Sequence, residues 1–121
     1  MISRLSGFAS NIVAISASGL VQRSDYDTVL VPAVEEALKA HDKLRLYYEI
    51  GEDFSGMEAG AMWEDFKVGI EHLTRWERIA VVSDVSWISH TVEAFGFLLP
   101  AKVRTFGRKD IDAARAWIVA Q

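Results

Sequence analysis

The stretch E-R-I-A-V-V-S-D, residues 77–84, decides the fold of this chain. Its apolar centre, residues 79–82, follows charged residues and is itself followed by Ser83 and Asp84. A short, unbroken apolar run with such boundaries is typical of a strand that is buried on both faces of a sheet. We therefore place this strand in the interior of a sheet and expect the neighbouring segments to provide helices above and below it.

Three other segments have strand patterns. Residues 12–15 form an apolar run that follows the turn residue Gly7, and they predict a first strand or hairpin. Residues 44–50 read L-R-L-Y-Y-E-I and alternate between apolar and other side chains, which indicates a second strand. Residues 101–106 predict the last strand.

The segment between the first two strands predicts a helix with an irregular start. Ser24 and Asp27 have the spacing of a capping box, which places a helix start after Ser24. Pro32 lies inside the helical pattern and has no backbone N–H. We therefore expect an initial turn followed by a main helix from about Val31, or one kinked helix.

Three later segments also predict helices. Between residues 57 and 73, apolar residues recur every three or four positions, which indicates one long amphipathic helix. Ser86 is placed to cap a further helix, which Gly96 and Pro100 would end. Residues 110–120 predict the last helix.

Strands that alternate with helices in this way favour parallel pairing with short crossovers. We predict a single α/β domain over residues 1–121, in which one sheet of four to five mostly parallel strands is covered by about four helices. The length of 121 residues suits one domain.

Composition narrows the class of protein. A hydrophobic content of 50% and a charged content of 25% are those of a soluble globular chain. No apolar run approaches the about 20 residues of a membrane span, and the start lacks the core of a signal peptide, so we expect a cytoplasmic location. The absence of cysteine excludes disulfides and thiolate metal sites. The formal net charge of −4 argues against nucleic-acid binding, which needs a basic face.

Several short motifs occur in an order that is fairly specific, although each motif alone is weak. They are D-Y at 25–26, V-L-V-P-A at 29–33, D-F-S-G at 53–56, W-E-D-F at 63–66, R-I-A-V-V-S-D at 78–84 with Trp87, V-R-T-F at 103–106 and A-A-R-A-W at 113–117. In these motifs the chain resembles the SpoIIAA-like proteins, a bacterial branch related to STAS domains. The resemblance implies a fold likened to both STAS domains and CRAL-TRIO lipid-binding domains, and it implies no settled activity.

The resemblance directs attention to Ser55. STAS domains of the anti-sigma-factor-antagonist type carry a phosphorylatable serine in a turn before the second helix, and residues 53–57, D-F-S-G-M, stand in that place. A helix N-terminus there would favour a phosphate, whereas Glu52, Asp53 and Glu58 would repel it, and the usual adjacent hydroxyl residue is missing. Ser55 is therefore either a phosphorylation or partner-contact site or a plain cap or turn residue, and we favour the second interpretation.

The sequence offers no defined catalytic or metal site. Asp84 follows the buried strand, where α/β proteins bind ligands, but no second group is spaced to act with it, so we interpret it as a loop or cap residue. His41, His72 and His90 are scattered and lack metal-ligand spacing. No phosphate-binding glycine motif or nucleophile elbow occurs. We therefore expect no enzymatic activity, no metal and no cofactor.

Apolar and aromatic residues gather around two of the predicted helices. They either line an apolar cavity beneath a mobile helix, as the CRAL-TRIO likeness suggests, or simply fill the core. Exposed residues near Phe54 would allow contact with a membrane surface, although the acidic residues nearby oppose anionic lipid. The predicted ligand-binding residues are Phe54, Met57, Met62, Trp63, Phe66, Trp87 and Phe95.

Our leading prediction is a non-enzymatic module that binds an apolar small molecule or lipid between the helix starting near Met57 and the helix starting near Trp87, with peripheral membrane contact as a related mode. The alternative is a regulatory protein-interaction domain of the STAS kind, in which the turn at Ser55 contacts a protein partner. We also expect the chain to self-associate, with a homodimer as the simplest form.

Overall fold

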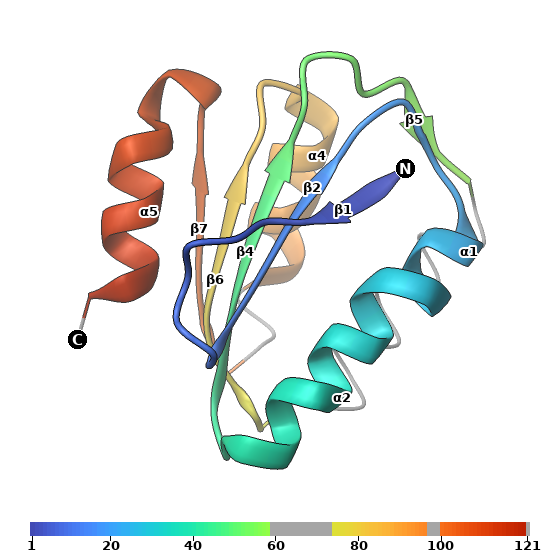
Figure 1. The fold of residues 1–121 in the computed structure, drawn as a ribbon. Coiled ribbons are helices and arrows are strands. Elements are labelled where there is room, and N and C mark those ends of the chain that lie inside the picture. Colours follow the sequence, from blue (N-terminus) through green and yellow to red (C-terminus); the bar gives the residue numbers. More distant parts are fainter. Residues whose placement is uncertain (59–73, 97–99, 121) are drawn as a thin grey trace.

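The computed structural model describes residues 1–58, 74–96 and 100–120 (Figure 1). Its centre is a five-stranded sheet in the order β1-β2-β4-β6-β7. β1 is antiparallel to β2, and every other neighbouring pair is parallel. The strands are β1 (Ile2–Arg4), β2 (Ile12–Ala17), β4 (Leu44–Ile50), β6 (Trp76–Val82) and β7 (Lys102–Phe106).

Strand β6 confirms the prediction made for residues 77–84. It lies between β4 and β7, inside the sheet. Val81 points into one hydrophobic core, whereas Ala80 and Val82 point into a second core on the opposite face. The run is apolar throughout because both of its faces are covered.

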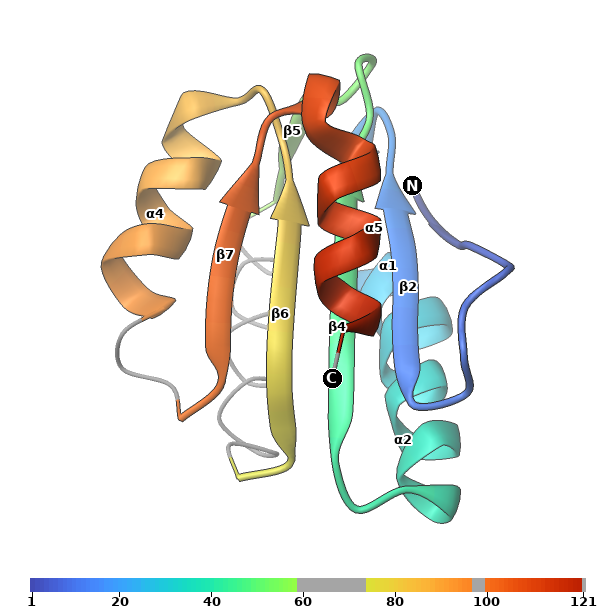
Figure 2. The same ribbon diagram turned by 90° about the vertical axis from the view of Figure 1, so that its left-hand side faces the viewer.

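Helices cover both faces of the sheet. On one face lie α2 (Val31–Ala40) and α4 (Ser86–Gly96), and on the other lies α5 (Ile111–Val119) (Figures 1 and 2). Ile88 of α4 is buried in the first core and Ile118 of α5 in the second. The predicted α/β fold with a mostly parallel sheet is confirmed.

A single turn, α1 (Arg23–Asp25), and a π turn (Tyr26–Leu30) precede α2. Because Pro32 has no backbone N–H, the usual helical ladder cannot run unbroken through this position. A wider turn stands directly before it, in which the N–H of Val31 bonds to the carbonyl of Tyr26. The predicted initial turn before a main helix from Val31 is confirmed.

The N-terminal cap of this helical segment differs from the predicted capping box, which paired Ser24 with Asp27. The residue before α1 is Gln22, and its backbone N–H donates to Asp25 Oδ2 at 2.7 Å. The same carboxylate lies 3.6 Å from the N-terminal ammonium group of Met1. The capping carboxylate is therefore that of Asp25, and the capping interaction lies two residues earlier than predicted.

The entry to α4 is also shaped by a different serine from the one predicted. Ser86 is the first residue of the helix, and the carbonyl of Val85 accepts the N–H groups of Ile88 and Ser89 at 3.1 and 3.2 Å. The hydroxyl of Ser83, at the buried end of β6, accepts the N–H of Val85 at 2.9 Å. The predicted cap role of Ser86 is wrong, because the helix starts one residue too early for it.

α4 is described as far as Gly96, the residue predicted to end it, and because residues 97–99 lie outside the described residues its end stays a prediction. The glycine lets this helix approach the sheet closely, because a Cβ atom added there would lie 3.1 Å from the Cβ of Val103. α5 begins at Ile111 after a 3-10 turn (Arg108–Asp110), one residue later than predicted.

A second sheet of two strands pairs β3 (Leu20–Val21) in parallel with β5 (Gly56–Met57). A long helix was predicted to start at Met57. That start is wrong, because Met57 lies in β5 and pairs with Val21. The remainder of that predicted helix, residues 59–73, lies outside the described residues.

The described residues hold three helices of nine or more residues, α2, α4 and α5, where about four were predicted. Among these described helices, none combines the length and the apolar character that a membrane crossing requires.

Candidate functional site

The parallel strands bring their carboxyl ends to one edge of the sheet, which is where α/β proteins bind ligands. The loops after β2 and β4 are tied together at this rim. Gly51 donates its N–H to the carbonyl of Ala17 at 2.8 Å, and Gly19 donates to the carbonyl of Asp53 at 3.2 Å. A Cβ atom on Gly51 would lie 2.9 Å from the oxygen of Ala17, so the approach requires glycine.

Ser55 lies on this rim with an exposed side chain. Its N–H donates to the carbonyl of Gly19 at 2.8 Å, and β5 follows immediately. Gly56 and Met57 have strand conformation, so the helix does not start at Met57 as predicted, and the expectation of a helix N-terminus near Ser55 falls on residues outside the described part of the chain. What the structure provides at Ser55 is an accessible hydroxyl on a loop whose backbone is held in place.

Two aromatic side chains beside the rim form what we call the apolar surface, defined as Phe54 and Trp87. The rings of Phe54 and Trp87 lie with their centroids 6.4 Å apart and their planes at 42°, a geometry within the range of favourable aromatic pairs. Trp87 is 44% exposed. Phe54 is partly buried against the first core, as is Met57.

The structure thus brings together two of the predicted ligand-binding residues, Phe54 and Trp87, which are distant in sequence. Met57, a third predicted lining residue, packs against the first core. The other predicted lining residues, Met62, Trp63 and Phe66, lie outside the described residues, as does the side chain of Phe95. The cavity predicted between two helices stays a prediction.

Asp84 and Arg108 connect the loops that follow β6 and β7. Asp84 Oδ1 accepts the backbone N–H of Arg108 at 3.0 Å, and Arg108 Nη1 donates to the carbonyl of Ile50 at 2.8 Å. Together these bonds link the carboxyl ends of β4, β6 and β7. The geometry supports the interpretation of Asp84 as a loop residue.

Arg108 itself was missed by the sequence analysis, since no local pattern shows that it reaches back to β4. Its Nε is buried without a hydrogen-bond partner, and Glu52 Oε1 lies 4.0 Å from it, beyond hydrogen-bond distance. A cationic donor with unused capacity therefore sits at the rim.

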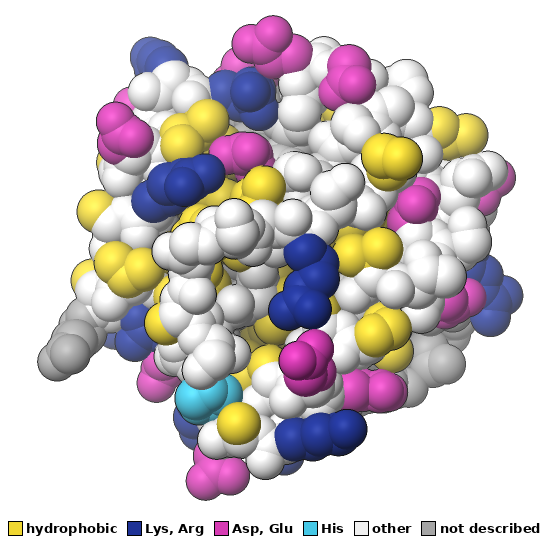
Figure 3. Space-filling view, in the orientation of Figure 1, with side chains coloured by type: hydrophobic (Ala, Val, Ile, Leu, Met, Phe, Trp, Pro, Cys, Tyr) yellow, Lys and Arg dark blue, Asp and Glu magenta, His cyan; other side chains and the backbone are white. Residues whose placement is uncertain are grey.

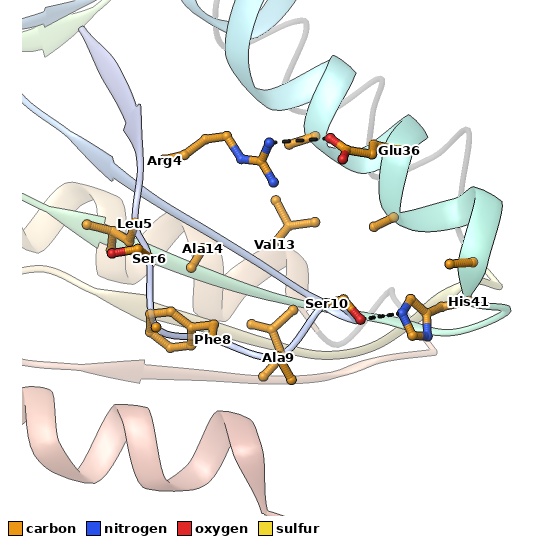
Figure 4. Close-up of a pocket in the computed structure, with 15 residues that line it drawn as sticks. Arg4, Leu5, Ser6, Phe8, Ala9, Ser10, Val13, Ala14, Glu36 and His41 are labelled. Carbon is orange, nitrogen blue, oxygen red and sulfur yellow. Dashed lines mark hydrogen bonds and ion pairs between the residues drawn. The ribbon is translucent and has the colours of Figure 1, made fainter.

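A separate pocket of about 250 Å³ lies between the loop after β1, strand β2 and helix α2 (Figure 4). Small apolar side chains form its floor, including Val13, Ala33 and Ala37. The space-filling view shows hydrophobic side chains in a hollow on this face, with charged side chains around it (Figure 3). Typical ligand pockets start at about 300 Å³, so this one suits only a small molecule.

Two polar pairs stand at the rim of the pocket. Arg4 Nη1 and Glu36 Oε2 are 3.4 Å apart, and Ser10 Oγ and His41 Nε2 are 2.8 Å apart (Figure 4). Among the described residues, no carboxylate bonds to the other ring nitrogen of His41, so a triad for nucleophilic catalysis is not assembled there. Nor does the described part of the chain contain a group of three His, Asp or Glu side chains placed to hold a metal ion.

A third cluster, also missed by the sequence analysis, lies on the face that α5 covers. Arg45 Nη1 donates to the carbonyl of Ile118 at 2.8 Å, and Arg78 Nη1 donates to the carbonyl of Trp117 at 2.7 Å. Two strands thereby donate to carbonyls in the last turn of α5, where a helix lacks its usual backbone donors. The carbonyl of Trp117 also accepts the N–H of Ala120 at 3.3 Å. These arginines act structurally, as the C-terminal cap of α5.

Tyr47 lies under the same helix. Its hydroxyl donates to Glu49 Oε1 at 2.9 Å, and the guanidinium of Arg115 lies 5.6 Å from its ring centroid. Burial, together with the bond to Glu49, raises the pKa of Tyr47 to about 12. The phenol is therefore neutral at physiological pH.

Comparison with known proteins agrees with this architecture. The family model described as SpoIIAA-like matches residues 12–119. A crystal structure of an uncharacterised protein with a SpoIIAA-like fold from Shewanella loihica superposes with a TM-score of 0.75 at 21% identity, covering 97% of this chain and 93% of that chain. At that identity the likeness concerns the fold. A comparison with curated proteins found no match. Because the family model spans the chain from β2 to α5, the chain belongs to the SpoIIAA-like family.

Proposed function

We propose that this chain is a non-enzymatic binding module that takes an apolar small molecule or a lipid at the apolar surface. The observation that carries the proposal is the contact between Phe54 and Trp87, two large rings that stay partly open to solvent beside the carboxyl ends of the strands. Large exposed rings at such an edge are a common feature of ligand sites.

The exposed indole would supply part of the free energy of binding. An indole of about 250 Å² that is 44% exposed would contribute about 2–3 kcal/mol if a ligand covered it fully, at about 25 cal/mol per Å². Micromolar binding requires a net free energy of about 8 kcal/mol, so most of it would have to come from the further lining residues.

The pocket beneath α2 does not serve this ligand. Its volume of about 250 Å³ is too small for a long acyl chain, and its rim is occupied by two polar pairs. We therefore assign the apolar ligand to the apolar surface, with Met62, Trp63, Phe66 and Phe95 as the further lining residues that the sequence predicts.

The test is a titration of the protein with dodecanoate and with neutral phosphatidylcholine vesicles, followed by native mass spectrometry and by vesicle flotation. Trp87→Ala and Phe54→Ala are expected to weaken retention of dodecanoate about tenfold or more. Val119→Ala is the matched control, because Val119 is an exposed apolar residue, 54% accessible, on the helix that covers the opposite face.

Retention of dodecanoate by the unaltered protein, lost in the Trp87 and Phe54 variants but kept in the Val119 variant, supports the proposal. Failure of the unaltered protein to retain dodecanoate, or equal weakening in all three variants, would contradict it. Binding to vesicles without retention of free dodecanoate would assign the surface to peripheral membrane contact.

The second candidate is a STAS-type regulatory domain that contacts a protein partner through Ser55. The exposed hydroxyl of Ser55, on a loop fixed by the bond from its N–H to Gly19, favours this alternative, as does membership of the family. Incubation with a cognate kinase and mapping of the modified residue tests it, with Ser55→Ala as the variant and Ser89→Ala as the control. Modification at Ser55 alone supports the candidate, and modification elsewhere removes it.

A further inference from the structure

Strand β7 forms one edge of the main sheet. It pairs with β6 only, and no strand lies beyond it in the described part of the chain (Figure 2). The backbone N–H of Ser83 donates to the carbonyl of Phe106 at 2.9 Å, so the backbone groups of Phe106 face β6. Since these groups alternate in direction along a strand, those of Val103 and Thr105 face outward from the sheet. β7 thus presents two N–H groups and two carbonyls to an incoming strand.

The side chains on one face of this edge are cationic. Register places Lys102 beside Arg78 and Arg104 beside Ala80, so Lys102 and Arg104 point to the face that α5 covers. Both are exposed, and neither forms an ion pair with a described residue.

Two aromatic rings hold the guanidinium of Arg104 in place. Its guanidinium carbon lies 4.8 Å from the ring centroid of Phe106 and 5.5 Å from that of Trp117. A guanidinium stacked on rings keeps its N–H groups at its periphery, where they are free to donate to a carboxylate. The stacking also reduces the side-chain entropy that is lost when a partner binds.

The opposite face of the edge has a different character. Thr105 Oγ1 donates to Glu93 Oε1 of α4 at 2.9 Å, and Val103 packs against Gly96 of α4. A residue of an incoming strand that pointed to this side would meet the apolar side chain of Val103 and the carboxylate of Glu93. Apolar or neutral residues suit that side, whereas acidic ones suit the side of Lys102 and Arg104.

We propose that β7 accepts an extended acidic segment of another protein as an additional strand of the sheet, with acidic residues alternating with apolar ones. The acidic side chains pair with Lys102 and Arg104, and main-chain bonds form with Val103 and Thr105. A second copy of this chain is not the occupant through its own β7, because antiparallel pairing of two such edges would set the cations of one copy against those of the other.

The experiment uses three synthetic peptides and the full chain in 50 mM salt. The peptides are E-V-E-V-E-V-E, its lysine counterpart K-V-K-V-K-V-K, and the block peptide E-E-E-E-V-V-V, which keeps the charge but loses the alternation. Binding is measured by calorimetry, and exchange of the Val103 and Thr105 amide protons is followed by NMR. The alternating acidic peptide is expected to bind and to protect these two amides.

The variants separate charge from folding. Lys102→Gln/Arg104→Gln is expected to weaken binding of E-V-E-V-E-V-E about tenfold, and Lys102→Gln alone about threefold. Lys39→Gln/Lys109→Gln removes two exposed cations elsewhere and is expected to leave binding unchanged. Equal binding by the three peptides, equal weakening in both double variants, or absence of protection at Val103 and Thr105 overturns the proposal. Binding of anionic vesicles without binding of any peptide also overturns the proposal. In that case Lys102 and Arg104 would contact a lipid surface.

Discussion

The guanidinium of Arg78 contacts one residue of α5 in two ways. Its Nη1 donates to the carbonyl of Trp117 at 2.7 Å, and its central carbon lies 5.3 Å from the centroid of the Trp117 indole ring. β6 therefore supplies both a cap for the helix end and a cation on the aromatic ring that packs against it. Arg45 of β4 donates to the next carbonyl, that of Ile118, at 2.8 Å.

Replacing Arg78 by Gln is expected to lower the free energy of unfolding by about 1–3 kcal/mol, because a charge-assisted bond and a cation–π contact are both lost. Urea unfolding followed by circular dichroism measures the change. Arg4→Gln is the matched control, since Arg4 makes an exposed ion pair that is worth at most about 1 kcal/mol. If the two variants lose the same stability, Arg78 does not cap α5.

Stability is expected to fall between about pH 10 and pH 12 because of Tyr47, whose pKa is raised to about 12 by burial and by its bond to Glu49. In this window the unfolded chain releases the phenolic proton while the folded chain keeps it, so the unfolded state binds fewer protons and gains stability as pH rises. Below about pH 10 both states are protonated and Tyr47 adds no pH dependence.

Tyr47→Phe removes this contribution, and its free energy of unfolding is expected to fall less than that of the unaltered protein between pH 9.5 and pH 11.5. The difference in slope is the informative quantity, because the remaining tyrosines titrate in both proteins. Parallel pH profiles for the two proteins would show that Tyr47 ionises equally easily in the folded and unfolded chains.

Gly51→Ala tests the close approach of the loops at the rim. A methyl group there would lie 2.9 Å from the backbone oxygen of Ala17, which cannot rotate away, so we expect a loss of about 1–3 kcal/mol. Gly107→Ala is the control, because its added Cβ would first meet the side chain of Asp84 at 3.4 Å. Thermal unfolding distinguishes the two, and equal melting temperatures would mean that the loop moves aside freely.

Two helix alanines that face the sheet are expected to respond differently to enlargement. Ala37 lines the pocket of about 250 Å³, so Ala37→Leu has room to place its side chain and should change stability by less than about 1 kcal/mol. Ala114 of α5 is fully buried against the sheet, so Ala114→Leu should cost about 1–3 kcal/mol. Urea unfolding measures both, and an equal loss in the two variants would mean that the pocket closes in solution.

Much of the fold was predictable because it depends on local patterns. β4 occupies residues 44–50 as predicted, and β6 includes the apolar run predicted as a strand at residues 79–82. Both predictions depend on the periodicity of apolar residues and on backbone preferences, which neighbours along the chain determine. Helix starts were less predictable, as the shift of the cap to Asp25 shows, because several polar residues near a helix start compete for the same backbone donors.

The candidate site was predictable in part. Phe54 and Trp87 were selected for their side-chain chemistry, but the ring contact between them depends on how the loop after β4 meets the start of α4. Ser55 was predicted to shape a turn, and it lies in the loop between β4 and β5, just after the turn at residues 52–53. The strand that follows it was missed, since residues 56–57 pair with a segment more than thirty positions earlier. A two-residue strand has no periodicity of its own to detect.

By itself, the sequence determined the order of the four parallel strands and of helices α2, α4 and α5, because burial on one or two faces imposes a repeat that can be read along the chain. Only the tertiary structure decided that Asp84 bonds to Arg108, that Arg78 caps α5 and that Lys102 and Arg104 share an open edge. Each of these contacts joins residues from different strands, loops or helices. The contacts depend on how those elements align in space, and that alignment leaves no periodic pattern in the sequence of either element.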